Sequence, residues 1–302
     1  LTSARTVLDR GLSETDRELP PGVALYEIAG PLFFGAAEKA MGALDSVADF
    51  VDELDQVPDG ATVIFSAHGV SRAVREAAEG RGLRVFDATC PLVTKVHVEV
   101  VKMRREGLDV VMIGHAGHPE VEGTMGQADG GIHLVQTPAD VEHLQVRDPE
   151  RVAYVTQTTL SVDDCTAVVA ALNKRFPGIA EPKKQDICYA TQNRQDAVKF
   201  MAPQCDLVLV VGSNTSSNSN RLREVAQKMG CEARLIASAD ELDPAWLEGR
   251  SRIGVTAGAS APEVLVRALI DRLRSLGATS VRTLPGIEES TSFPLPRGLA
   301  RS

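Results

Sequence analysis

The sequence predicts an α/β protein of three pseudo-repeated units, each with a small, mostly parallel sheet, around a central cavity. Cys90 and Cys188 each stand at a turn between a short apolar run and a helical pattern. From each cysteine the chain runs to an apolar strand whose closing glycine, Gly114 or Gly212, lies 24 positions further on. Such self-similarity indicates repeated structural units. Short apolar runs between helical patterns favour parallel sheets covered on both faces.

The first unit is expected to be truncated or replaced at its N-terminus. A third closing segment, Val63-Ile-Phe-Ser-Ala-His-Gly-Val-Ser71, resembles the ends of the two later copies. The cysteine belonging to it would fall near the first residue of the chain. Residues 1–67 contain neither Cys nor His.

The individual elements follow from apolar patterning and from turn residues. Ser71 is a predicted helix N-cap, because its hydroxyl can accept a hydrogen bond from the first helical turn. Strands are expected at 61–66, 85–87, 109–114, 132–136 and 206–212, and two more open near 154 and 254. Helices are expected at 71–79, 91–106, 138–144, 162–176, 192–201, 221–229 and 262–276. The segments 115–124 and 213–220 are read as polar, ligand-like loops.

This pattern suggests five segments along the chain. Residues 1–48 form an atypical stretch, in which 20–48 resemble a strand and helix of the STAS domain of sulfate-permease-type transporters through Gly30-Pro-Leu-Phe-Phe-Gly35. An ordinary strand–helix unit is the alternative for that stretch. The remaining segments are the rest of the first unit at 49–90, the second unit at 91–187, the third unit at 188–276 and a tail at 277–302 that packs back.

The amino-acid composition indicates which partners the protein can have and in which compartment it is expected. A net charge of −9 and 4% aromatic residues argue against nucleic acid, which calls for a basic surface. No apolar run reaches the length of a membrane span. Five cysteines in a chain of 302 residues favour reduced thiols in the cytoplasm over a disulfide framework.

Cys90 and Cys188 are candidate metal ligands. The positive end of a helix favours the thiolate form that binds iron, and Pro91 suits the first helical position. Three units around one axis would bring such thiolates together, and three cysteines fit an iron–sulfur cluster with one open iron. Neither cysteine belongs to a Cys-x-x-Cys pair, which disfavours a zinc knuckle. A buried structural thiol is the alternative, and it is the expectation for the three cysteines outside the repeat, namely Cys165, Cys205 and Cys231.

Polar side chains behind the strands form a candidate phosphate site. Hydroxyl and amide groups together with helix N-termini make a neutral binding set for phosphate; the side chains are those of Thr158, Ser216, Ser217, Asn218 and Ser260. His68 and His118 add donors that can be cationic. Each residue alone is equally compatible with an ordinary turn.

Glu120 is the candidate proton donor, because a carboxyl group beside a binding loop can serve as a general acid. Glu122 is an alternative that the sequence leaves open. His97, His133 and His143 lie within helix or strand patterns and are interpreted as structural.

Six segments of this sequence closely resemble the IspH (LytB) family. They run over residues 87–97, 117–124, 156–161, 186–194, 216–222 and 256–262. The resemblance extends from about residue 50 to 295. It implies three α/β units around a 4Fe-4S cluster held by three cysteines, with Cys90 and Cys188 as two of them.

The resemblance also implies an activity and roles for the other candidates. The family reduces 4-hydroxy-3-methylbut-2-enyl diphosphate to isopentenyl and dimethylallyl diphosphate, the last step of the methylerythritol phosphate route to isoprenoids. Electrons come from ferredoxin or flavodoxin. Glu120 would relay the proton, and the diphosphate would be bound by His68, His118, Thr158, Ser216, Ser217, Asn218 and Ser260.

This sequence departs from the family pattern at its start. The family opens with a Gly-Phe-Cys-Ala-Gly-Val turn that supplies the first cluster cysteine, and no such turn is present here. Two alternatives to an active reductase follow. One is a catalytically impaired or misjoined copy that retains only diphosphate binding, and the other is a STAS-type regulatory fusion.

Overall fold

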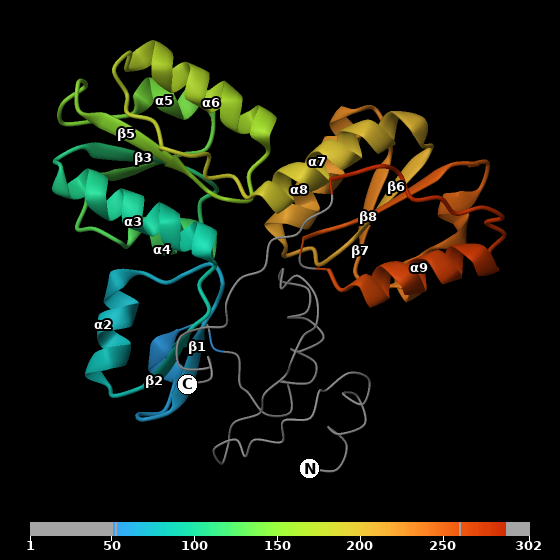
Figure 1. Ribbon diagram of the computed structural model, residues 1–302, viewed down its shortest axis with the longest axis horizontal. Helices are drawn as coiled ribbons and strands as arrows, with labels where there is room; N and C mark the ends of the chain where they lie inside the picture. Colours follow the sequence, from blue (N-terminus) through green and yellow to red (C-terminus); the bar gives the residue numbers. More distant parts are fainter. Residues whose placement is uncertain (1–50, 52, 260, 288–302) are drawn as a thin grey trace.

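The computed structural model describes residues 51, 53–259 and 261–287 of the chain. The expectations for residues 1–48, Ser260 and the end of the tail therefore lie outside the described residues. Within these ranges the chain forms one two-stranded and two three-stranded parallel sheets, each with its own helices (Figure 1). The predicted α/β class with small parallel sheets is confirmed.

The described part of the first unit contains the two-stranded sheet. Ser71 caps its helix by accepting a hydrogen bond from the Val74 N–H, as predicted. The elements are the 3-10 helix η2 (Leu54–Gln56), β1 (Thr62–Phe65), α2 (Arg72–Gly80) and β2 (Arg84–Asp87).

The second and third units repeat one topology. In each, the first strand lies in the middle of the sheet, and the next two strands pair on either side of it, in the orders β4-β3-β5 and β7-β6-β8. The second unit contains α3 (Pro91–Arg105), β3 (Asp109–Ile113), α4 (Pro119–Met125), β4 (Ile132–Val135), α5 (Pro138–His143), β5 (Val152–Thr156) and α6 (Val162–Arg175). The third contains α7 (Tyr189–Met201), η3 (Ala202–Gln204), β6 (Leu207–Val211), α8 (Ser217–Lys228), β7 (Ala233–Ile236), η4 (Ala239–Glu241), η5 (Pro244–Leu247), β8 (Ile253–Ala257) and α9 (Glu263–Ser275).

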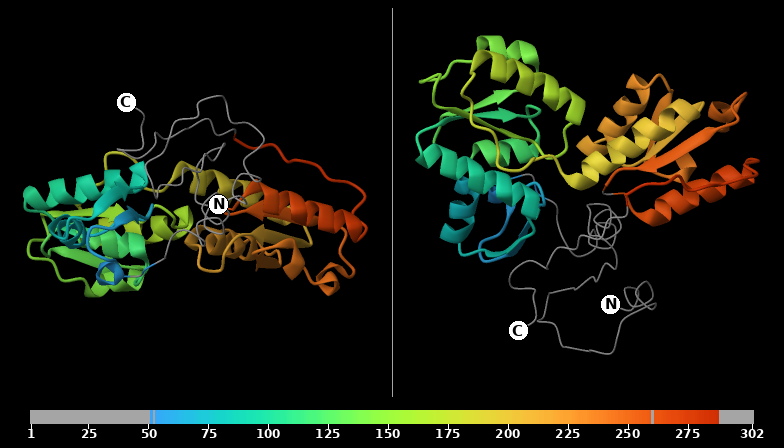
Figure 2. Two further views of the ribbon diagram at one scale, coloured as in Figure 1. Left: turned by 90° about the horizontal axis from the view of Figure 1, so that it is seen from below. Right: turned by 45° about the horizontal axis from the view of Figure 1, so that its top comes forward.

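The central strands explain why each sheet carries helices on both faces. Every residue of β3 and of β6 is buried. Because successive side chains point to opposite faces, Val111 and Ile113 pack into the core under α5 and α6, whereas Val110 and Met112 pack against α3. Figure 2 shows the three units spread side by side in a shallow layer.

Several element boundaries differ from the predictions. Helix α7 begins at Tyr189 rather than at 192, and α8 begins at Ser217 rather than at 221, because Cys188 and Ser216 are the N-caps. The segment 115–124, expected to be a loop, contains the short helix α4, which starts at Pro119 behind the N-cap His118. Strand β7 was not predicted.

The five-segment division of the chain stays a prediction, although Leu284 of the tail packs against the core of the third unit. No helix in the described part of the chain is both long and apolar enough to cross a membrane.

Candidate functional site

The predicted site residues follow the carboxyl ends of the strands, which is where parallel sheets bind ligands. His68 follows β1, Cys90 follows β2, His118 follows β3 and Thr158 follows β5. Ser216 occupies the corresponding place after β6 in the third unit. Hydrogen bonds tie these ends together, since the Cys90 N–H donates to the Ala67 carbonyl at 3.0 Å and the Cys188 N–H donates to the Thr158 carbonyl at 2.9 Å.

Cys90 and Cys188 cap two helices that both begin near the middle of the molecule (Figure 1). Leu92 of α3 packs against the small cluster that Cys188 and Ala190 form, and Cys188 is near enough to influence the ionisation of Cys90. Burial raises the pKa of the Cys90 thiol, and the nearby Cys188 and Glu120 raise it further. The backbone N–H groups at the start of α3 lower the pKa of Cys90, as expected for a helix N-terminus. In the protein alone this effect is smaller than the increase that burial causes.

His68 and His118 meet edge to face, with ring centroids 5.5 Å apart and an angle of 85° between the rings. The Nδ1 atom of His118 accepts a hydrogen bond from the Glu120 N–H at 3.2 Å, so the proton of the neutral ring resides on Nε2. Burial lowers the pKa of His68, and burial together with His68 and His115 lowers the pKa of His118 to about 4. Both rings are therefore neutral hydrogen-bonding groups at pH 7.

Glu120 is 2% exposed and is held by both polar groups of one residue. The Thr158 N–H donates to Oε1 at 2.6 Å and the Thr158 hydroxyl donates to Oε2 at 3.0 Å. Burial raises the pKa of Glu120 to about 7, against the effect of these two hydrogen bonds. Glu122, the alternative in the sequence, lies two residues further along α4 and is exposed. Of these two residues, Glu120 is the one in a buried environment that suits a proton donor near neutral pH.

Ser216, Ser217 and Asn218 form the first turn of α8. The Ser217 hydroxyl accepts hydrogen bonds from Thr159 at 3.1 Å and from Gln157 at 3.5 Å, which ties the third unit to the second. Asn218 is 6% exposed; its amide nitrogen donates to Thr191, and its Oδ1 is buried with no hydrogen-bond partner. Ser216 accepts from the Ser219 N–H and caps the helix. Three of the neutral groups predicted from the sequence lie here, whereas Thr158 follows β5 in the second unit and Ser260 is outside the described residues.

Sequence reasoning missed the polar residues that support this site. Asp186 is buried beside Cys188; it accepts from Lys95 Nζ at 2.7 Å and from the Thr156 N–H at 2.9 Å. Gln157 joins the loop after β3 to α8, because its Oε1 also accepts from the His115 N–H at 3.0 Å. Both residues lie within the segments 156–161 and 186–194 that the sequence singled out, but their partners are distant in sequence.

The donor chemistry matches two ligands of an iron–sulfur cluster. Cys90 and Cys188 are neighbouring reduced thiols at helix N-termini. Cys165 lies in the core of the second unit, while Cys205 and Cys231 lie in or against that of the third. Of the five cysteines in the sequence, Cys90 and Cys188 are the two that stand at the N-termini of helices. Among the described residues no group of three or more His, Cys, Asp or Glu side chains is arranged to hold a metal ion.

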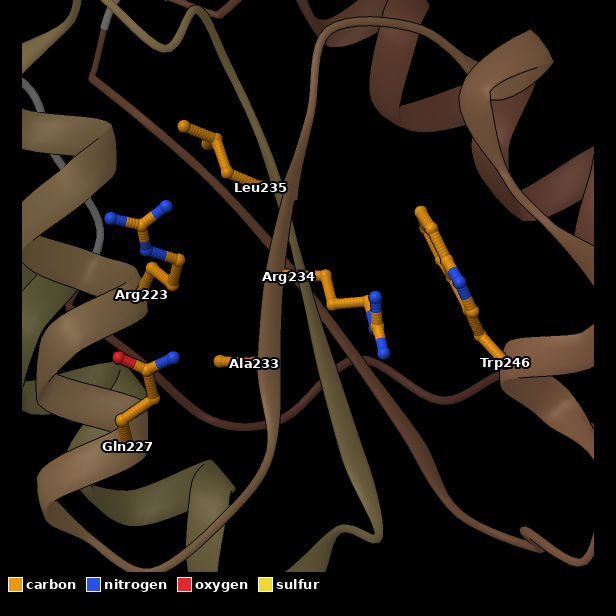
Figure 3. Close-up of a pocket in the computed structure, with 6 residues that line it drawn as sticks. All are labelled: Arg223, Gln227, Ala233, Arg234, Leu235 and Trp246. Atoms are coloured by element: carbon orange, nitrogen blue, oxygen red, sulfur yellow. The ribbon is translucent and has the colours of Figure 1, made fainter.

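A separate depression lies beside strand β7 of the third unit (Figure 3). Arg223 and Gln227 of α8 face it from one side and Trp246 of η5 from the other. The Arg234 guanidinium stacks over the Trp246 ring, 4.5 Å from its centroid. None of the predicted site residues lines this depression.

Comparisons with known proteins agree with these features. The model of the family described as LytB protein matches residues 40–274. The chain is 71% identical over 298 residues to a Bordetella pertussis protein named 4-hydroxy-3-methylbut-2-enyl diphosphate reductase, covering 97% of this chain and 90% of that protein. A Ralstonia nicotianae protein of the same name is 61% identical over 296 residues, with 97% and 90% covered.

Two solved structures are similar as well. The E-1-hydroxy-2-methyl-but-2-enyl-4-diphosphate reductase from Plasmodium falciparum superimposes with a TM-score of 0.82 and 37% identity, covering 86% of this chain and 82% of that one. A second structure, described as (E)-4-hydroxy-3-methyl-but-2-enyl diphosphate reductase, the terminal enzyme of the non-mevalonate pathway, gives a TM-score of 0.53 and 33% identity over 79% and 84%.

Proposed function

The chain belongs to the LytB family, and from this membership we propose that it reduces 4-hydroxy-3-methylbut-2-enyl diphosphate to isopentenyl and dimethylallyl diphosphate. The reaction takes up two electrons and two protons, breaks one C–O bond and releases the hydroxyl as water. The observation that carries the proposal is the buried Glu120, held by Thr158 close to two cysteines and beside a set of neutral hydrogen-bonding groups.

In this proposal the groups that receive the diphosphate are uncharged before it binds. His118 presents its Nε2–H, because Nδ1 is already an acceptor for the Glu120 N–H. Ser216, Ser217 and Asn218 lie at the N-terminus of the 12-residue helix α8, whose backbone N–H groups and dipole favour an anion. The rings of His68 and His118 gain protons most readily when the anion arrives, because a nearby negative charge raises the pKa of imidazole.

Glu120 delivers a proton to the reacting end of the substrate. A pKa of about 7 leaves a substantial protonated fraction at neutral pH, and general acids work best near the operating pH. Thr158 fixes both carboxyl oxygens, so the acid keeps one orientation. The Thr158 carbonyl also accepts from the Cys188 N–H, which links the acid to one of the cysteine turns.

Cys90 and Cys188 would hold two corners of a 4Fe-4S cluster. When bound, such a cluster supplies one-electron redox chemistry and an iron that accepts an oxygen ligand. The external reductant is a small redox protein of the ferredoxin or flavodoxin class. The proposed compartment is the reducing cytoplasm, and the support for it is the cysteine content of the sequence.

Iron and acid-labile sulfide per chain, after anaerobic reconstitution, test the proposal. We expect about four of each, lost in Cys90→Ser and in Cys188→Ser. They should be retained in Cys165→Ser, a matched change of a buried thiol in the core of the second unit. Reconstituted protein should then release isopentenyl and dimethylallyl diphosphate with a chemical one-electron donor. If the unmodified chain takes up little iron but still binds pyrophosphate, the result would instead support the alternative of an impaired copy that retains only diphosphate binding.

A further inference from the structure

Gly69 lies at a tightly packed turn directly after His68. Its φ is +75°, a left-handed conformation that favours glycine, and its N–H donates to the Ser66 carbonyl at 3.1 Å. A Cβ built on Gly69 would lie 2.7 Å from Cε1 of His97 and 3.1 Å from the Thr89 methyl group. The imidazole of His97 is therefore in direct contact with the backbone next to a proposed substrate ligand.

His97 projects from the middle of α3 and is 6% exposed. Its Nε2 atom is buried and has no hydrogen-bond partner, and the ring edge that carries Nε2 faces Gly69. Burial, with a smaller contribution from the cation of Arg75, lowers the pKa of His97 to about 4. A buried polar atom without a partner costs stability, so packing alone would be served better by an apolar side chain.

The opposite side of the Gly69 turn is closed as well. A Cβ on Gly123 of α4 would lie 2.8 Å from the Gly69 carbonyl oxygen, so these two backbones approach closely. Helix α4 carries Glu120 and is capped by His118. The Cys90 N–H donates to the Ala67 carbonyl, which fixes the other neighbour of His68. The turn is thus held between α3 and α4.

We propose that His97 is a positioning residue, whose ring edge holds the Gly69 turn against α4 and so orients His68 toward His118. The proposal deepens the proposed function and rests on it only for the role of His68 as a diphosphate ligand. His97 itself touches neither substrate nor cluster. It acts through the turn that it buttresses.

Two substitutions separate this role from a merely structural one. His97→Gln keeps a long planar side chain whose terminal group reaches the place of Nε2. His97→Leu is shorter but apolar, and it removes the unpartnered buried nitrogen. A structural role predicts that Leu is at least as stable as His and causes no change at the site. A positioning role predicts that Leu preserves stability but releases His68, whereas Gln retains the position of His68.

The experiment is ¹³C NMR of the histidine Cε1 atoms in the full-length protein, titrated with acid, with thermal unfolding measured alongside. We expect the pKa of His68, which burial holds below 6.5, to move toward that value in His97→Leu and to stay in place in His97→Gln. The exposed His143 of α5 serves as an internal control. An unchanged His68 signal in His97→Leu would overturn the proposal, as would an equal shift in both variants.

Pyrophosphate binding by calorimetry supplies the second readout. We expect the Kd to rise about tenfold in His97→Leu and to rise further in Gly69→Ala. In the double variant with His97→Leu and Gly69→Ala, the factor by which the Kd rises should be smaller than the product of the factors for the two single variants. The reason is that the methyl group added at Gly69 no longer meets the imidazole ring. Independent, multiplying effects would contradict the contact. If the unmodified protein binds no pyrophosphate, the proposed substrate site fails, while the His68 titration still decides the role of His97.

Discussion

The second and third units share one fold but place different chemistry at the same position. Both central strands are followed, five residues later, by a helix N-cap: His118 after Ile113 and Ser216 after Val211. Two residues beyond the cap, the second unit has Glu120 and the third has Asn218, and both side chains are buried. A carboxyl group and an amide of similar shape therefore occupy equivalent places.

The surroundings of these two residues differ, and the difference fits the roles proposed for Glu120 as a proton donor and for Asn218 as a ligand of the diphosphate. Glu120 receives two hydrogen bonds from Thr158, and burial raises its pKa to about 7. Asn218 cannot titrate, and its Oδ1 has no hydrogen-bond partner. The second unit therefore contains a titratable group with a pKa of about 7, while the third contains a neutral amide at the same position, which fits the roles proposed for them as acid and as ligand of an anion. A duplicated unit can divide acid chemistry and binding by one exchange of carboxylate for amide.

The largest effect is expected when the second unit is made to resemble the third. Glu120→Gln keeps the acceptor for the Thr158 N–H but removes the acidic proton. We expect kcat to fall about a hundredfold or more, with the Kd for pyrophosphate changed little. Steady-state kinetics of reconstituted protein measure this, and Glu122→Gln, an exposed change on the same helix, is the control. Equal losses in both variants would remove Glu120 from its role.

Glu120→Gln should also change how the free energy of unfolding depends on pH. The folded-state pKa of Glu120, about 7, lies above its ordinary value of 4.5, so the folded protein binds the proton more tightly than the unfolded chain does. The stabilisation is complete below pH 4.5 and is lost as the pH rises through 7. Relative to Glu120→Gln, the free energy of unfolding of the unmodified protein should fall by about 3 kcal/mol across this window.

Urea unfolding of cluster-free protein at pH 5 and pH 8 measures the difference. His118 contributes in the opposite sense, because its folded-state pKa of about 4 lies below 6.5 and stability is lost as the pH falls between these values. Both proteins contain His118, so its contribution cancels in the comparison. A difference that does not change between the two pH values would show that Glu120 is not perturbed.

The sequence could predict much of this comparison, because it depends on local signals. The equal spacing of the two cysteine turns and their glycines predicted the repeat, and the apolar runs predicted buried parallel strands. The predicted helix starts at 192 and 221 lie three and four residues after the observed ones. Neither a cysteine nor a serine-rich loop identifies the N-cap residue unambiguously. Strand β7, an edge strand that contains Arg234, lacks a continuous apolar run.

The supporting contacts could not be predicted in the same way. Thr158 holds Glu120 across 38 positions and Lys95 holds Asp186 across 91. Burial, which sets the pKa of Glu120, depends on the packing of the whole second unit. Sequence could name Glu120 and Glu122 as equal candidates, and only the fold buries one and exposes the other.

A smaller effect is expected when the third unit is made to resemble the second. Asn218→Asp adds a buried acidic group where the diphosphate is proposed to bind. Because like charges repel strongly in a partly desolvated site, the Kd for pyrophosphate at pH 8 should rise at least about tenfold. Asn214→Asp, at an exposed position two residues before the N-cap Ser216, adds the same charge outside the buried first turn of α8. Calorimetry that gives one Kd for both variants would contradict the placement of the anion.

The smallest effect concerns the tie between the two units. Thr159 donates to the Ser217 hydroxyl at 3.1 Å, and removal of either hydroxyl breaks this bond. Ser217→Ala and Thr159→Ala should each lower the free energy of unfolding by at least about 1 kcal/mol, the usual net value of one hydrogen bond, because each hydroxyl also accepts from the Gln157 amide. Only Ser217→Ala should also weaken pyrophosphate binding, because Ser217 is proposed to touch the anion and Thr159 is not. Urea unfolding and calorimetry on the two variants separate the roles, and equal losses of binding would make Ser217 a structural tie and not a ligand.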